Sequence, residues 1–263
     1  MGLVGENGAG KSTLIKTVLG IWRADSGVTE LFGKTFDGSE RAVLERVGVV
    51  LDEEQFPETM TASQIGSTLG GIYKQWDNGA YESYLRRFSL PRTKPLRQLS
   101  KGMKMKLSIA AALSHRAELL ILDEPTSGLD PVMRDEVCEL LADFVSQGSN
   151  AVLFSSHIVS DLEKTCDYIT FLHKGRVLLC EEKDRLKEEY GILRCPAEKA
   201  QAFPAAARRV TPYGAELLLR RADVPGKELG QATIEDIFLF FSRGSQPGEA
   251  SDTTVSDCAE KGA

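Results

Sequence analysis

A glycine-rich run near the start of the sequence has the residue types and spacing that bind phosphate groups. It reads Gly5-Glu-Asn-Gly8-Ala-Gly10-Lys11-Ser12 and fits the pattern G-x-x-x-x-G-K-[ST], between an apolar run and an amphipathic stretch. Glycines let successive backbone N–H groups point at phosphate oxygens. Lys11 would reach the β- and γ-phosphates, and the Ser12 hydroxyl would bind Mg²⁺. The candidate phosphate-binding residues are Gly5, Asn7, Gly8, Ala9, Gly10, Lys11, Ser12 and Thr13.

Two carboxylates follow an apolar run further along the chain. Residues 119–122 predict a buried strand, and Asp123 and Glu124 come directly after it. In open α/β sheets, ligands bind at the carboxyl ends of the strands. Asp123 would orient Mg²⁺ through water, and Glu124 would polarise a water molecule for attack on the γ-phosphorus. Such a pair is more often merely solvated, but its combination with the first motif favours the catalytic interpretation.

The elements that must position these residues alternate between strands and helices. Continuous apolar runs predict strands at residues 3–4, 47–51, 119–122, 151–154 and 168–172, and helical patterns separate them. Such strands are typical of a largely parallel sheet covered on both faces, in an α/β fold.

The chain divides into four predicted parts. Residues 1–52 and 115–180 form the phosphate-binding core, and the mostly helical residues 53–114 form a subdomain inserted into it. Residues 181–243 form a small C-terminal accessory region, and residues 244–263, polar and without aromatic residues, predict a disordered tail. The accessory region contains one apolar helical face, which we expect to be buried rather than docked on a partner: Ile234, Ile237, Phe238 and Phe241.

Composition argues against several classes of protein. The 263 residues carry a formal net charge of −6, which disfavours nucleic-acid binding through bulk charge. The apolar runs are far shorter than the roughly 18 residues of a membrane-spanning helix. The first residues lack the pattern of a secretory signal, so we expect a cytoplasmic protein.

These motifs, taken in order, resemble the ATP-binding subunit of an ABC transporter. The resemblance rests on residues 5–13, on Leu-Ser-Lys-Gly-Met at 99–103, on Asp123 and Glu124 followed by Pro-Thr-Ser-Gly-Leu-Asp130, and on His157. The Leu-Ser-x-Gly signature just before the two carboxylates selects this family among proteins with a phosphate-binding loop. The chain is most similar to the ATPases of ABC-2-type and bacitracin-resistance-like exporters, over about residues 1–179. The resemblance implies a P-loop NTPase core.

Further implications of the resemblance concern activity and partners. The chain would bind ATP with Mg²⁺ and hydrolyse it to power export through a separate membrane permease, which would hold it at the inner face of the membrane. Two ATPase subunits, identical or different, would join head to tail, so that Ser100 and Gly102 of one contact the γ-phosphate held by the other. Asp130 is similar to the aspartate of the dimer interface, and His157 to the histidine that contacts the γ-phosphate. No nucleic-acid partner is expected.

Several positions depart from the family pattern. Asp52 stands in place of the usual glutamine; its carboxylate can bind Mg²⁺ or a water molecule, but it adds negative charge beside a triphosphate. Lys101 and Met103 replace the common Gly and Gln of the signature. Only four residues precede Gly5, where the family has two further strands and an aromatic residue that stacks on adenine. We therefore expect either a truncated chain or a misplaced start.

Two other functions stay open. The chain could be a non-transport ABC-type ATPase, a regulatory or ribosome-associated switch, although such relatives usually combine two cassettes and a basic linker. It could also be a truncated cassette that hydrolyses no ATP. A six-span membrane protein encoded next to this chain would favour transport.

Overall fold

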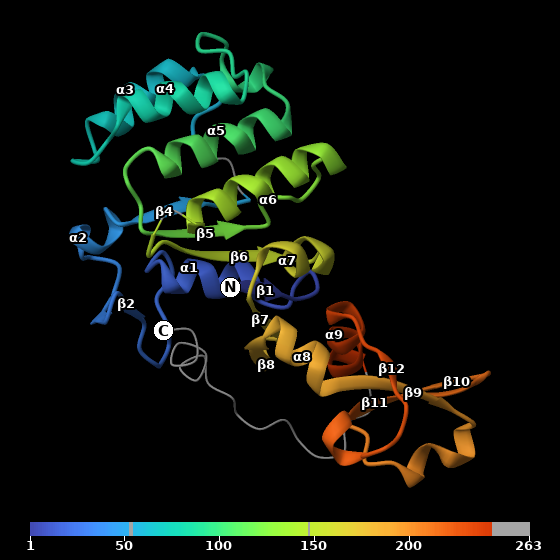
Figure 1. Ribbon diagram of the computed structural model, residues 1–263. Coiled ribbons are helices and arrows are strands. Elements are labelled where there is room, and N and C mark those ends of the chain that lie inside the picture. The colour runs from blue at the N-terminus through green and yellow to red at the C-terminus, as the bar shows by residue number, and fades with distance from the viewer. Residues whose placement is uncertain (53–54, 147, 244–263) are drawn as a thin grey trace. The chain divides into compact units, whose positions relative to one another are not determined.

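The computed structural model describes residues 1–52, 55–146 and 148–243, so the predicted tail at 244–263 lies outside the described residues. The chain divides into two compact units, coloured along the sequence in Figure 1. The first unit comprises residues 11–156. The second unit combines residues 1–10 with the chain from His157 onward.

Three parallel strands form the sheet of the first unit, with β5 between β4 and β6. Figure 1 shows α5 and α6 over one face of these strands and α1 over the other. Leu120, Ile121 and Leu122 of β5 are almost fully buried, as expected for a strand covered on both faces. The elements of this unit are α1 (Lys11–Val18), β2 (Glu30–Leu31), β3 (Lys34–Thr35), α2 (Arg41–Leu44), β4 (Val47–Val50), α3 (Ala62–Gly70), α4 (Asn78–Arg87), a 3₁₀ turn (Leu96–Gln98), α5 (Lys101–Leu113), β5 (Leu119–Asp123), α6 (Pro131–Ser146) and β6 (Ala151–Ser156).

Local signals in the sequence begin the helices of the inserted segment. Thr61 caps α3: its side chain accepts a hydrogen bond from the Gln64 N–H, and the Gln64 side chain accepts one from the Thr61 N–H. The Asp77 carboxylate caps α4 by accepting a hydrogen bond from the Ala80 N–H at 2.9 Å. Tyr81 then joins the two helices, because its buried hydroxyl donates to the Ala62 carbonyl at 2.9 Å. These contacts hold α3 and α4 together near α5, which carries the signature residues.

The second unit contains β1 parallel to β7 and β8 antiparallel to β7. The strands expected at residues 3–4 and 168–172 are therefore confirmed as β1 and β7. The elements of this unit are β1 (Gly2–Val4), α7 (Val159–Thr165), β7 (Tyr168–His173), β8 (Arg176–Glu182), α8 (Lys183–Glu189), β9 (Tyr190–Cys195), a 3₁₀ turn (Ala197–Ala202), β10 (Ala207–Thr211), β11 (Gly214–Arg220), a 3₁₀ turn (Arg221–Asp223), β12 (Gly230–Gln231) and α9 (Ile234–Arg243).

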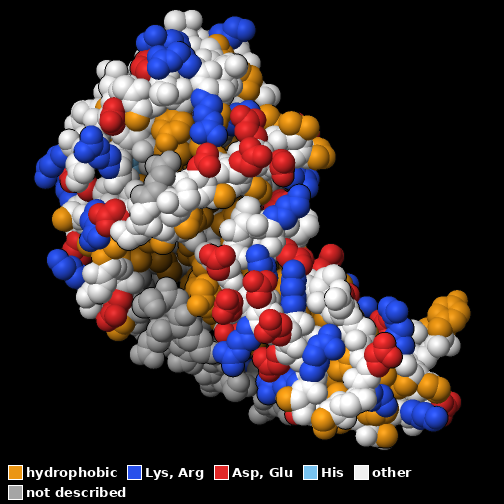
Figure 2. All heavy atoms as spheres, in the orientation of Figure 1, with side chains coloured by type: hydrophobic (Ala, Val, Ile, Leu, Met, Phe, Trp, Pro, Cys, Tyr) orange, Lys and Arg blue, Asp and Glu red, His pale blue; other side chains and the backbone are white. Residues whose placement is uncertain are grey.

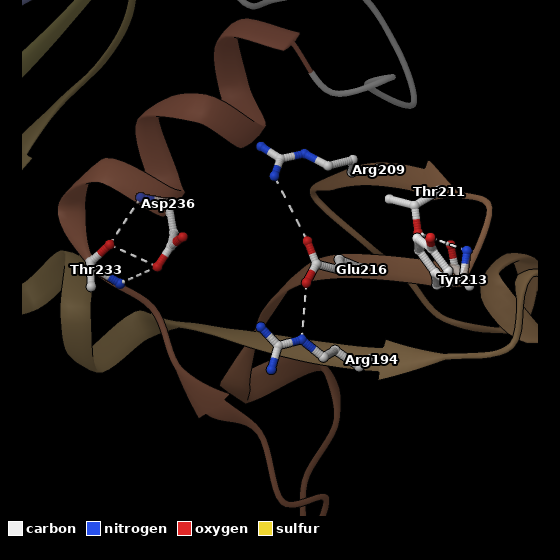
Figure 3. Close-up of polar contacts among 8 residues, drawn as sticks. Arg194, Arg209, Thr211, Tyr213, Glu216, Thr233 and Asp236 are labelled. Carbon is white, nitrogen blue, oxygen red and sulfur yellow. Dashed lines mark hydrogen bonds and ion pairs between the residues drawn. The ribbon is translucent and has the colours of Figure 1, made fainter.

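The accessory region is built around an antiparallel sheet that the sequence did not lead us to expect. Its strand order is β10-β11-β9-β12, and Leu217 and Leu219 of β11 lie in a small apolar core on one face. On the other face, Glu216 accepts a hydrogen bond from Nε of Arg194 at 2.9 Å and forms an ion pair with Arg209 (Figure 3). One carboxylate therefore links three neighbouring strands.

Helix α9 closes the accessory region with its apolar face inward. Thr233 and Asp236 form reciprocal hydrogen bonds at its start (Figure 3). Ile234 and Ile237 are fully buried and Phe238 nearly so, which confirms the expected burial of these residues. Phe241 is only half-buried and packs edge-on against Tyr190, with ring centroids 5.8 Å apart.

The described surface carries charges of both signs. Acidic and basic side chains are interspersed over the face that Figure 2 shows. No helix in the described part of the chain has the length and hydropathy that crossing a membrane requires.

Gly20, just after α1, gives the first prediction. Gly20 and Gly38 both have positive φ, and a Cβ on Gly20 would lie 2.3 Å from the Gly38 Cα. We expect Gly20→Ala to lower the free energy of unfolding by about 3 kcal/mol, because the strain of a left-handed backbone adds to the steric collision with Gly38. Gly27→Ala is the matched control, because Gly27 also has positive φ but faces open space; it should lose only about 1 kcal/mol. Equal losses in urea unfolding would show that the close approach is unimportant.

Candidate functional site

The phosphate-binding loop depends on two glycines with left-handed backbone conformations. Gly8 has a φ of +82° and Gly10 a φ of +107°, which other residues adopt only with strain. The Ala9 N–H donates to the Glu6 carbonyl at 3.0 Å, and the Ala9 carbonyl accepts from the Gly175 N–H at 2.8 Å. A Cβ on Gly8 would meet no atom within 4 Å, so the space beside this part of the loop is open to a ligand.

Lys11 is the first residue of α1 and is held in a buried ion pair. Its Nζ lies 3.0 Å from Oε1 of Glu124, and the two side chains are only 5% and 11% exposed. The structure thus brings together the lysine and the second carboxylate that the sequence analysis singled out. Ser12 and Thr13 follow in the first turn of α1 and are exposed, as is Asn7 in the loop.

Strand β5 and its neighbour β6 fix the two carboxylates. Asp123 ends β5, is 2% exposed and accepts a hydrogen bond from the Ser155 hydroxyl at 2.6 Å. The N–H of Glu124 in turn donates to the same hydroxyl at 3.0 Å and to the Ser155 carbonyl. Ser155 was not anticipated, although its position directly after the strand predicted at residues 151–154 was a usable signal. It fixes the orientation of the catalytic candidates from β6.

Glu124 has an uncommon backbone conformation. Its φ of +51° lies in the left-handed region, which is disfavoured for a residue with a side chain. The chain turns sharply where β5 ends, and the Glu124 side chain reaches Lys11 instead of continuing the strand alternation. Strained conformations of this kind occur often at functional sites, where the surrounding structure must hold them.

The signature residues lie at the start of α5. The Ser100 hydroxyl accepts a hydrogen bond from the Met103 N–H at 3.2 Å, so it caps this helix. Ser100 is exposed and Gly102 half-buried. A Cβ on Gly102 would lie 2.7 Å from the end of the Met133 side chain, so α6 crowds this glycine.

The remaining candidates occupy helix starts and strand ends. Oδ1 of Asp130 accepts a hydrogen bond from the Met133 N–H at 3.0 Å and so caps α6, in addition to any role at an interface. His157 directly follows β6 and is exposed. Asp52 is also exposed, and its Oδ1 lies 3.7 Å from Nζ of Lys101.

A groove of about 370 Å³ lies between the described part of the 51–58 segment, residues 51–52 and 55–58, and the start of α5. Its floor is apolar, with Leu51, Phe56, Leu99 and Met105 among its lining residues. Two ion pairs bridge its rim, each between an acid of the 51–58 segment and a lysine of α5: Asp52 with Lys101 at 3.7 Å, and Glu58 with Lys104 at 3.4 Å. An apolar floor with a charged rim suits an amphipathic protein segment.

Comparisons with known proteins agree on one family. A family profile described as "ABC transporter" matches residues 1–127. The lantibiotic transport ATP-binding protein SrtF of Streptococcus pyogenes is 34% identical, over 69% of this chain and 78% of SrtF. The bacitracin transport ATP-binding protein BcrA of Bacillus licheniformis is 37% identical over 71% of this chain. The match spans only 62% of the length of BcrA.

A solved structure extends the similarity to the fold. It is described as an ATP-binding subunit of an ABC transporter and is 29% identical to this chain, with a TM-score of 0.63. The match covers 71% of this chain and 79% of that subunit. The largely parallel α/β arrangement predicted from the sequence is thus the fold of this family.

Lys11 gives the prediction for this site. We expect Lys11→Ala to weaken ATP binding by at least tenfold, because a charge-assisted contact to phosphate is lost. Lys16→Ala, on the same helix, is the control; the Lys16 ammonium lies over the Trp22 ring at 4.9 Å. Isothermal titration with ATP measures both. Equal affinities of Lys11→Ala and the wild type for ATP would contradict the assignment of residues 5–13 as a phosphate-binding loop.

Proposed function

Because this chain belongs to the ABC transporter ATP-binding proteins, we propose that it binds and hydrolyses ATP to power export through a separate membrane permease. The observation that carries the proposal is the 3.0 Å contact between Lys11 and Glu124. A phosphate-binding lysine and a candidate general base meet at the end of a buried parallel strand, where ligands bind in this fold class.

Oxygen donors in the first unit fit Mg²⁺, which prefers hydroxyl, carboxylate, phosphate and water oxygens. Ser12 would supply its hydroxyl, while Asp123, oriented by Ser155, would act through water. Asp52 is a further carboxylate of the right type. The ion, when bound with ATP, would neutralise charge on the β- and γ-phosphates.

Glu124 would act as the general base. The ammonium of Lys11 lies 3.0 Å from Oε1 of Glu124. An incoming phosphate would take that ammonium, so Glu124 could then accept a proton from the attacking water. ATP binding and activation of the base are coupled in this scheme, because both need the same ion pair to open.

Two subunits would complete the site. Ser100 and Gly102 of one subunit would contact the γ-phosphate bound to the other, with Asp130 at the interface and His157 near the phosphate. The exposure of Ser100, Asp130 and His157 in the single chain supports this role, since a second subunit could reach them.

The groove beside α5 would receive a cytoplasmic segment of the permease. Its apolar floor and the two ion pairs on its rim support docking of an amphipathic helix. The permease would thereby hold the chain at the inner face of the membrane. Asp52, which lines this groove, would connect docking to the nucleotide site.

Glu124→Gln tests the hydrolytic proposal. We expect ATP hydrolysis to fall by about 10²- to 10⁴-fold, the usual contribution of a positioned base. ATP binding should become tighter, because the variant removes the carboxylate that competes with phosphate for Lys11. Glu118→Gln is the control: Glu118 pairs with Arg46 at an exposed site just before β5. Hydrolysis by Glu124→Gln at the wild-type rate would dismiss Glu124 as the base.

The same variant tests the two-subunit site. With ATP uncleaved, sedimentation should show a shift from monomer to dimer by mass action. ADP lacks the γ-phosphate and should produce no shift. A variant that binds ATP but stays monomeric would contradict the proposal that Ser100 acts on a second subunit.

Crosslinking tests the groove. In a purified complex with the permease, a lysine-reactive crosslinker should join the permease to Lys101 and Lys104 on the rim. Lys199 and Lys227 of the accessory region are the comparison sites. Links confined to these two lysines would place the permease elsewhere.

A further inference from the structure

Two positions that depart from the family pattern contact each other. Lys101 replaces the common glycine of the signature, and Asp52 replaces the common glutamine, yet Nζ of Lys101 lies 3.7 Å from Oδ1 of Asp52. The ammonium offsets the negative charge that Asp52 would otherwise place near a triphosphate. The two departures are therefore electrostatically complementary.

Lys101 stands where it could also reach a phosphate. It lies between Ser100 and Gly102 and is the first residue of α5. The Lys101 Nζ is close to the loop that leads to Asp130, because a Cβ on Gly128 of this loop would lie only 3.3 Å from Nζ. The side chain is 54% exposed, and its ammonium ends a flexible four-carbon stem. It can therefore turn toward any ligand of the Ser100 hydroxyl.

The contact with Asp52 is weak enough to exchange. The Asp52 side chain is 49% exposed, and ion pairs between solvent-exposed groups contribute little to stability. A γ-phosphate carries more negative charge than one carboxylate and offers several acceptor oxygens. It would outcompete Asp52 for the ammonium once it came within reach.

We propose that Lys101 is an additional phosphate-binding residue, held by Asp52 in the separate subunit and transferred to the γ-phosphate of ATP on the second subunit. The proposal rests on the proposed function, in which Ser100 acts between subunits. It adds a full positive charge to a contact made otherwise by a hydroxyl and backbone N–H groups. Asp52 would lower the affinity between subunits until ATP is present on both.

The experiment uses Glu124→Gln as background and measures the monomer–dimer dissociation constant by sedimentation with ATP. Lys101→Ala should raise this constant about tenfold, as expected for loss of one charge-assisted contact, and Lys101→Arg should keep most of the affinity. Asp52→Asn should lower the constant several-fold, because it releases Lys101. The double variant should match Lys101→Ala, because the effect of Asp52→Asn on this constant comes from the release of Lys101.

Matched variants distinguish failure of the inference about Lys101 from failure of the two-subunit site. Lys74→Ala is the control for loss of a lysine, because Lys74 also lies 3.7 Å from a carboxylate, that of Glu45, and should leave the constant unchanged. If Ser100→Ala weakens the dimer but Lys101→Ala does not, the inference about Lys101 is wrong and the two-subunit site stands. If no ATP-dependent dimer forms, or Ser100→Ala has no effect, the two-subunit site fails and the role of Lys101 fails with it.

Discussion

A buried ion pair between Lys11 and Glu124 is the constraint on which the rest of the site depends. Removing a lysine and a glutamate from water is unfavourable unless the two opposite charges lie close together. Here they meet at 3.0 Å, with both side chains about nine-tenths buried. The first turn of α1 must therefore stay in register with the end of β5.

The strained backbone of Glu124 shows how the alignment is maintained. A residue with a side chain at a φ of +51° persists only where neighbouring contacts hold it. Those contacts come from Ser155, which hydrogen-bonds both Asp123 and the Glu124 N–H. One serine on β6 thus fixes the Mg²⁺ candidate and the base candidate together. Parallel pairing of β5 with β6 is what places that serine beside them.

The sequence predicted the parts of the fold whose signals are local. Apolar runs located β4 to β7 within a few residues, and the loop motif located α1, because burial on both faces leaves a continuous pattern. The accessory sheet was missed for the opposite reason. In β10, Arg208 and Arg209 interrupt the apolar pattern, and β12 has only two residues. The sequence pattern of short strands with one partly exposed face resembles that of irregular segments.

Contacts between distant residues could not be predicted in the same way. The motifs indicated that Lys11 and Glu124 belong to one site, but not that the two side chains form an ion pair. Asp52 was a source of unfavourable charge in the sequence, and only its contact with Lys101 reveals a compensating cation. In both pairs a carboxylate forms an ion pair with a lysine ammonium group that a phosphate would bind more strongly. The nucleotide would then act by exchanging partners among charges already in place, which ties its binding to the release of Glu124 and Asp52. In this scheme, nucleotide binding and a change in the protein would follow from the same exchange, because neither carboxylate would keep its lysine once the phosphate was bound.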